Sequence, residues 1–524
     1  MNFTLLKNKN SILIAAHVAV AELVFSLLFG PGFWGPDALN GYIQSITKQY
    51  SSTQPVFLAF ICSLTNPLLP GALPIFLIVA LLYFSGLALL LFIKIPNRWL
   101  ASFLFFCLSF WPQLIGHIAV VQSEEMQLGL LSLFIALTIV LYSAIRYRYI
   151  LFAVNTLLLL CFWLVRHDTA LIAVLLSYLL SYSFFKVHSY KVVGAMILMI
   201  GFFMLTDGAL DSVLHFNTKC KQEMKNALMI ADLAGISLDS KVDYVPDYCW
   251  QPYVPEVERT IEKFRVTQRW ERSYFSYLFN VDPTVGIFTY NTTDYTSDIF
   301  HVWWKTVFSH PYTYLKIHLK YFVYFLSETN FQASLYDGVS YSKVNNSKLE
   351  IDYSEAVTKF LRAHNDRFKY INGCIIYYND DRKINQSEEN DLMLLVDQRR
   401  SRDVKGMVHY SQIPSKIYNT RNTLTENYVL PFFNLFQDRM KIFSCIFLYF
   451  IASVVSLFFR NNIRDKYLRL AFTILICCGL INVIQRFLVF TDPIFRFGVI
   501  SLLFWIFAWV ILLSEYYRRK NILS

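Results

Sequence analysis

The stretch GALPIFLIVALLYFSGLALLLFI (Gly71–Ile93) contains no charged residue and is long enough to cross the hydrocarbon core of a bilayer as one α-helix. Of the 524 residues, 55% are hydrophobic and only 16% are charged, against roughly a quarter charged in soluble domains. The apolar residues are gathered into runs like this one. The sequence therefore predicts an all-α polytopic membrane protein.

Further apolar runs of similar length occur on both sides of one long polar stretch. They are Ser11–Gly30, Trp99–Val121, Met126–Ile145, Ile150–Val165, Thr169–Phe185, Val192–Leu205, Ile442–Phe459, Leu470–Phe490 and Phe497–Leu513. Together they predict about ten transmembrane helices. We expect an N-terminal transmembrane bundle at 1–206, a large, mostly helical extracytoplasmic region at 207–430, and C-terminal transmembrane helices with a basic tail at 431–524.

The basic residues indicate how the chain is oriented. Cytoplasmic loops carry an excess of Lys and Arg. With the N-terminus in the cytoplasm, every short loop assigned to that side is basic: Lys7 and Lys9, Lys94 and Arg98, Arg146 and Arg148, Lys186 and Lys191, and Arg460, Arg464, Lys466 and Arg469. The tail adds Arg518, Arg519 and Lys520. Topology thus accounts for the net charge of +10 without a nucleic-acid partner. We expect an integral cell (inner) membrane protein with both termini cytoplasmic.

The polar region has helical patterns at Lys219–Leu233 and Pro255–Trp270. Asp298–Leu326 is aromatic and amphipathic, which predicts helices that lie on the outer membrane face. Its second half, residues 312–327, could instead be part of a spanning hairpin. Cys220 and Cys249 also fall in this region, where a disulfide between them is an open alternative.

Two of the predicted outer loops carry acids. Asp37 lies in GFWGPDALNGYIQ (Gly32–Gln44), where it is either a helix N-cap or a functional carboxylate. Glu124 and Glu125 come just before a predicted span. Adjacent acids at a helix start interact favourably with the helix dipole, and they could equally bind a metal or position a hydroxyl.

Cations occur at the same predicted face. Arg166 and Asp168 flank a short turn, where they either pair locally or form an anion site in which Asp168 orients Arg166; His167 is a weaker candidate base. Arg486 and Arg496 flank the last outer turn and could clamp a phosphate, or extend to the lipid headgroups.

Two side chains of the first predicted span are also polar. Glu22 lies inside that span as a further buried charge, for which an Arg or His is a plausible partner. His17, on the same span, is expected to serve packing.

No P-loop, nucleophile elbow, HExxH or dinucleotide motif is present. The stretches WGPDALNGYIQSITKQYSSTQPVFLAF (Trp34–Phe60), QSEEMQLGLLSLF and LVRHDTALIAVLL (Leu164–Leu176) resemble the outer loops of the C-type (GT-C fold) integral membrane glycosyltransferases. That superfamily includes protein O-mannosyltransferases and lipid A aminoarabinose transferases. Where many bacterial members have His-Pro-Pro, this chain has Gln54, Pro55 and Val56.

The resemblance implies a glycosyltransferase with a GT-C-like fold. Asp37 would be the catalytic base, and the donor would be a sugar on a polyprenyl phosphate. The acceptor would be a glycan, lipid or protein outside the cytoplasm, and Glu124 or Glu125 would position it or a metal. Arg166, Arg486 and Arg496 would bind the phosphate, with Asp168 orienting. A divalent metal is left open, and no other cofactor is expected. The alternatives are a transporter or flippase of a lipid-linked glycan, and a non-enzymatic scaffold or receptor.

Overall fold

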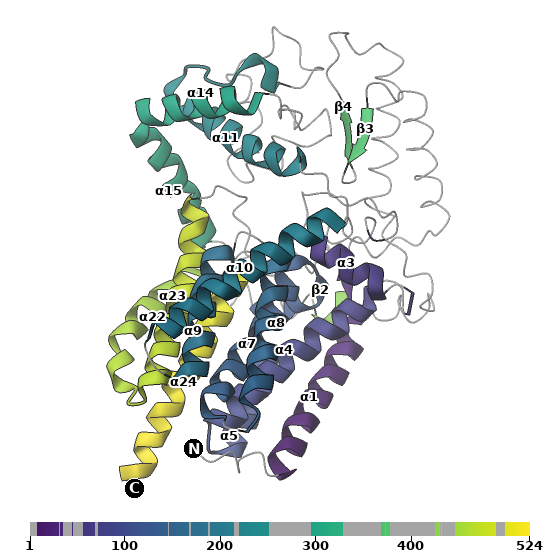
Figure 1. Ribbon diagram of the computed structural model, residues 1–524, viewed down its shortest axis with the longest axis vertical. Helices are drawn as coiled ribbons and strands as arrows, with labels where there is room; N and C mark the ends of the chain where they lie inside the picture. The colour runs from purple at the N-terminus through teal and green to yellow at the C-terminus, as the bar shows by residue number, and fades with distance from the viewer. Residues whose placement is uncertain are drawn as a thin grey trace.

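The computed structural model of the chain describes most of the apolar segments and part of the polar region (Figure 1). The described residues are 8–30, 32–34, 45, 56–65, 67–68, 72–144, 146–166, 169–186, 189–213, 219–250, 295–327, 368–371, 374–377, 425–429, 431, 446–488 and 498–523.

The bundle is built from apolar helices. They are α1 (Asn8–Phe29), α3 (Val56–Thr65), α4 (Leu73–Lys94), α5 (Arg98–Ser109), α6 (Pro112–Ile118), α7 (Ser123–Ser143), α8 (Arg148–Val165), α9 (Ala170–Phe185), α10 (Tyr190–Val213), α22 (Ile446–Phe458), α23 (Lys466–Leu488) and α24 (Val499–Leu523). Among the described residues, seven helices are long and apolar enough to cross a membrane, or eight if the bent pair α5–α6 forms one span. Helices α9 and α22 are apolar but shorter. The chain is therefore an all-α polytopic membrane protein, as its sequence predicts.

The centre of the bundle is formed by α4, α7, α23 and α24, which bury the largest shares of their apolar segments. Small residues allow α4 and α7 to approach closely. A Cβ atom added at Gly86 on α4 would lie 2.2 Å from the carbonyl carbon of Ser132 on α7. Next to this contact, the Ser132 hydroxyl donates a 2.9 Å hydrogen bond to the Tyr83 carbonyl. Such close approach of small residues is typical of membrane helix pairs, in which dispersion contacts replace the hydrophobic effect as the main source of stability.

The run Trp99–Val121, which the sequence predicts as one span, is bent. It breaks between Ser109 and Pro112, where α5 and α6 meet at 59°. Proline lacks a backbone N–H, its ring clashes with the carbonyl four residues earlier, and it disfavours helical geometry in the residue before it. Trp111 accordingly is extended, with ψ of 121°. The end of the run, β2 (Val120–Val121), is a short strand.

Short connections between packed helices reverse the chain direction, so successive connections alternate between the two ends of the bundle. Both termini lie at one end, and α11, α14, β3 and β4 lie beyond the other (Figure 1). The end that carries the termini also holds the connection from α4 to α5 and the 3-10 turn η8 (Arg460–Asn462) between α22 and α23. Helix α10 continues through residue 206, the predicted domain boundary, as far as Val213.

Three helices form a separate unit beyond the bundle. They are α11 (Lys219–Ser240), α14 (Thr296–Ser309) and α15 (Pro311–Ser327). The helices predicted at Lys219–Leu233 and Asp298–Leu326 are thus confirmed. The buried Asp232 carboxylate on α11 joins all three, because it accepts hydrogen bonds from Trp303 Nε1 on α14 (2.9 Å) and His318 Nε2 on α15 (3.2 Å). The lower end of α15 packs against α22 and α23, so it connects this unit to the bundle.

The outer region also contains irregular elements. They are η3 (Asp247–Cys249), the antiparallel pair β3 (Phe368–Ile371) and β4 (Cys374–Tyr377), and the π-helical turn η7 (Thr425–Val429). Cys249 has a free thiol that is buried in the apolar contact between α11 and α14, so it forms no disulfide with Cys220. Burial raises the pKa of this thiol and keeps it protonated. The helix predicted at Pro255–Trp270 lies outside the described residues.

The close contact of α4 with α7 predicts a specific sensitivity to volume. Gly86→Ala should destabilise the protein by about 2 kcal/mol, the usual scale of overpacking, because the new methyl group meets backbone atoms that cannot move independently. Thermal unfolding of the detergent-solubilised protein, followed by circular dichroism, measures the change. Gly201→Ala on α10 is the matched control, since a Cβ there meets no atom within 4 Å. Equal unfolding midpoints for the two variants would contradict the packing argument.

Candidate functional site

Two short strands join the segment that follows α1 to the start of α7. Strand β1 (Phe33–Trp34) pairs in parallel with β2, and the register aligns Phe33 with Val120 and Trp34 with Val121. Segments far apart in the sequence are thus held side by side at the end of the bundle opposite the termini (Figure 1). The strand that ends at Val121 leads directly into the acidic first turn of α7.

Glu124 and Glu125 occupy that first turn and are both buried, with 1% and 0% exposure. A helix N-terminus carries partial positive charge and unpaired N–H groups, which favour carboxylates. The Ser123 hydroxyl adds a 2.9 Å hydrogen bond to Glu124 Oε2. Burial of an ionised carboxylate is still unfavourable in free energy unless a cation or further hydrogen-bond donors contact it.

Arg166 supplies the cation for Glu124. It ends α8 in an extended conformation, and its Nη1 pairs with Glu124 Oε1. The Arg166 side chain is 17% exposed, so the pair lies at the edge of the buried region. Two further bonds fix the turn that carries it. The Thr169 hydroxyl donates to the Arg166 carbonyl (2.8 Å), and Gln127 Nε2 on α7 donates to the Thr169 hydroxyl (3.1 Å).

His117 is the partner of Glu125. Its Nδ1 donates to Glu125 Oε1 over 3.3 Å, and both side chains are almost fully buried. His117 lies on α6, so the bend before Pro112 sets the direction in which it approaches α7. Gln113, one turn earlier, donates to the Tyr449 hydroxyl on α22 (3.4 Å) and so connects this corner with the C-terminal helices. We refer to Ser123, Glu124, Glu125, Arg166 and His117 as the polar cluster.

The structure brings together three of the residues predicted from the sequence: Glu124, Glu125 and Arg166. Arg486 lies in the last turn of α23, but its side chain is outside the described residues. Asp37, Asp168 and Arg496 also lie outside them, as does the proposed Arg166–Asp168 pair. Sequence reasoning missed His117, Gln127 and Thr169. The one available signal for His117 was its short distance along the chain from the acid pair, but a straight helix through Val121 would not have brought the two together.

The two polar side chains of α1 differ in their surroundings. Both carboxylate oxygens of Glu22 are buried and have no hydrogen-bond partner in the part of the chain that the structure describes, so the expected Arg or His partner is not found there. His17 serves packing, as predicted. Its ring lies 4.8 Å from that of Phe92 and 5.6 Å from that of Phe105, both edge-on.

The polar cluster has the chemistry of a paired acid–base site. One carboxylate is balanced by a guanidinium and the other is bonded to an imidazole, which can hold or release a proton. Across the described ranges, no three His, Cys, Asp or Glu side chains come close enough together to hold a metal ion. A metal at Glu124 or Glu125 would therefore need further ligands from elsewhere in the chain or from a substrate.

Comparison of the chain with protein-family models, with curated proteins and with solved structures found no match.

The Arg166–Glu124 pair predicts non-additive mutational effects. Arg166→Gln should destabilise the protein by about 3 kcal/mol, because it leaves a buried carboxylate without its cation. The double variant Arg166→Gln, Glu124→Gln should recover most of that loss, since neither charge then remains. Chemical unfolding in detergent gives the free energy of unfolding of Arg166→Gln, of Glu124→Gln and of the double variant. If the double variant loses as much free energy of unfolding as the two single variants lose together, the two side chains do not interact.

Proposed function

We propose that this chain is a ten-span membrane glycosyltransferase of the C type, which moves a sugar from a polyprenyl-phosphate donor to an extracytoplasmic acceptor. In this proposal α9 and α22 are short spans and α5–α6 is one bent span. The end of the bundle with the termini faces the cytoplasm, which agrees with its basic connections. The polar cluster and the outer helices then lie on the opposite side of the membrane.

The observation that carries the proposal is the pairing of β1 with β2. It fixes Trp34 beside Val121, and only three peptide units separate Trp34 from Asp37. The Asp37 Cα can thus be no further than roughly 11 Å from that of Trp34, given about 3.6 Å per extended residue. Since Glu124 follows Val121 by three residues, the same limit of about 11 Å applies to its Cα, and the strand pair supports placing Asp37 at the end of the bundle that carries the polar cluster. The first and second outer loops form a single site in this proposal.

The proposed reaction is a direct displacement at the anomeric carbon. Asp37 takes the proton of an acceptor hydroxyl, the hydroxyl oxygen bonds to the anomeric carbon, and the bond from that carbon to the polyprenyl-phosphate oxygen breaks. One base without a covalent intermediate implies inversion of configuration.

The phosphate that leaves needs cations. Arg166 already neutralises Glu124, which favours Arg486 and Arg496 for this role. Arg166 then maintains the polar cluster, and the His117–Glu125 pair is left to position the acceptor.

Removing the base should abolish transfer. We expect Asp37→Asn to lower the rate by about 10²–10⁴-fold, the usual contribution of general-base catalysis, without changing insertion or stability. The assay follows the loss of radiolabelled sugar from a panel of polyprenyl-phosphate donors added to membranes that contain the protein. Asp298→Asn is the matched control, because Asp298 is exposed on α14, and this variant should keep full activity.

Two results would contradict the proposal. One is full activity of Asp37→Asn. The other is movement of the intact donor across proteoliposomes with no loss of its sugar, which would identify a transporter or flippase.

A further inference from the structure

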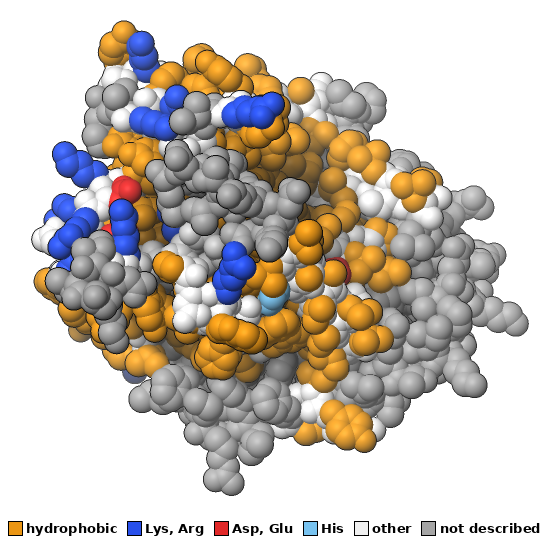
Figure 2. All heavy atoms as spheres, turned by 90° about the horizontal axis from the view of Figure 1, so that it is seen from below, with side chains coloured by type: hydrophobic (Ala, Val, Ile, Leu, Met, Phe, Trp, Pro, Cys, Tyr) orange, Lys and Arg blue, Asp and Glu red, His pale blue; other side chains and the backbone are white. Residues whose placement is uncertain are grey.

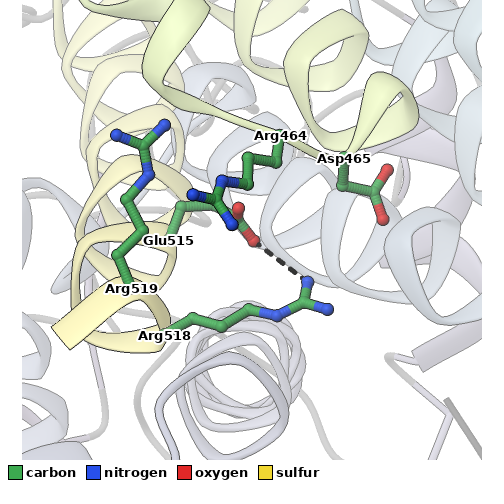
Figure 3. Close-up of a pocket in the computed structure, with 5 residues that line it drawn as sticks. All are labelled: Arg464, Asp465, Glu515, Arg518 and Arg519. Atoms are coloured by element: carbon green, nitrogen blue, oxygen red, sulfur yellow. Dashed lines mark hydrogen bonds and ion pairs between the residues drawn. The ribbon is translucent and has the colours of Figure 1, made fainter. Parts of the chain in front are cut away.

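A second charged site lies at the opposite end of the bundle, where the two chain termini are. A pocket of about 280 Å³ opens there between the turn that links α22 to α23 and the end of α24. Its lining consists of Arg464, Asp465, Glu515, Arg518 and Arg519 (Figure 3). Figure 2 looks onto this end and shows Lys and Arg side chains gathered on one side of it, beside hydrophobic ones.

The two acids of the pocket are already engaged. Asp465 caps α23, because its Oδ1 accepts hydrogen bonds from the backbone N–H groups of Tyr467 (2.9 Å) and Leu468 (3.1 Å). Glu515 is 4% exposed and lies 3.5 Å from Nη1 of Arg518. Each carboxylate therefore already has a partner, and the three arginines of the pocket exceed its two acids by one positive charge.

The arginines, in contrast, retain unused donors. Arg519 Nη2 donates to the Asn462 carbonyl, whereas its Nε is buried and donates to no acceptor in the described part of the chain. Arg464 is exposed and forms no hydrogen bond or ion pair with the residues that the structure describes. In Figure 3 its guanidinium extends toward the centre of the pocket. The donors that a ligand with several acceptor oxygens can reach are the exposed Arg464 guanidinium and the remaining Nη donors of Arg519, because the Arg519 Nε is covered by the protein itself.

The surroundings add positive charge. The half-buried Lys94, at the end of α4, interacts electrostatically with Asp465, Glu515 and Arg518. With it, four cations face two carboxylates in and beside the pocket. The pocket also lies where the candidate spans Lys466–Gln485 and Val499–Arg519 begin and end. This is the depth of the lipid phosphates in a bilayer.

We propose that this pocket binds a phosphate oxyanion, with Arg464 and Arg519 as its donors. Planar guanidinium groups suit phosphate oxygens, which they can contact in pairs. The three arginines that line the pocket exceed its two carboxylates by one charge, which a singly charged phosphodiester balances. An anionic phospholipid headgroup and free phosphate share this chemistry. Bound there, the ligand would link the turn between α22 and α23 to the end of α24, and the site is independent of the glycosyltransferase proposal.

Direct binding measurements on the full-length protein test this site. Native mass spectrometry in detergent gives the dissociation constants of dioctanoyl phosphatidylglycerol, dioctanoyl phosphatidylcholine and inorganic phosphate. We expect phosphatidylglycerol to bind more tightly than phosphatidylcholine. Arg464→Gln should weaken its binding about tenfold, the scale of one lost charged hydrogen bond. Because the Arg464 side chain is exposed and forms no such contact with the described residues, this variant should fold.

Arg98→Gln is the matched control. It removes the same charge from an exposed position at the same end of the bundle but outside the pocket, and it should leave binding unchanged. Glu515→Gln provides an independent test, because loss of the carboxylate removes repulsion and releases Arg518. This variant should bind phosphatidylglycerol more tightly than the parent protein.

The outcomes separate the sources of the phosphate. Selective binding of phosphatidylglycerol that Arg464→Gln weakens supports a lipid headgroup. Binding of inorganic phosphate that Arg464→Gln weakens, with no preference between the two lipids, supports free phosphate at the same site. Equal losses in Arg464→Gln and Arg98→Gln would overturn the proposal, because general attraction to a basic surface would then account for binding. Absence of binding by all three probes would overturn it as well.

Discussion

The missing backbone N–H of Pro112 is the constraint on which the polar end of the bundle depends. A helix cannot continue through it, so α5 and α6 meet at 59° inside a segment long and apolar enough to span a membrane. Two consequences follow. Helix α6 brings His117 to Glu125, and the chain after it is extended as β2, where it pairs with β1. Without the bend, the first outer loop and the start of α7 would have no reason to meet.

Three buried carboxylates among the described residues have partners that come from other helices. Glu124 uses Arg166, Glu125 uses His117, and Asp232 in the outer unit uses both Trp303 and His318. Taking a carboxylate out of water is costly, and the matching donor restores most of what is lost. Each pair therefore fixes how two or three helices lie against one another. Glu22 has no such partner among the described residues, and it lies on α1, whose apolar segment is one of the least buried.

The two ends of the bundle use arginine in different ways. At the outer end Arg166 is directed inward to a carboxylate and closes a buried network. At the end with the termini, Arg464 and Arg519 border an open pocket whose acids are held by a helix cap and by Arg518. The first arrangement orders the protein itself, whereas the second leaves guanidinium donors for an outside acceptor.

The sequence by itself determined the membrane class, the placement of most spans and the helices at 219–233 and 298–326, because span length and apolar periodicity are local properties of the chain. Pro112 was also visible, but the bend at this residue was not predicted. The partner of Glu124 was not predictable, since Arg166 lies 42 residues away and each had a nearer candidate role. The β1–β2 pair has only two residues in each strand, too few for any periodic signal. The tertiary structure decided these contacts, because the cost of burying a charge can be met by any donor that packing brings close.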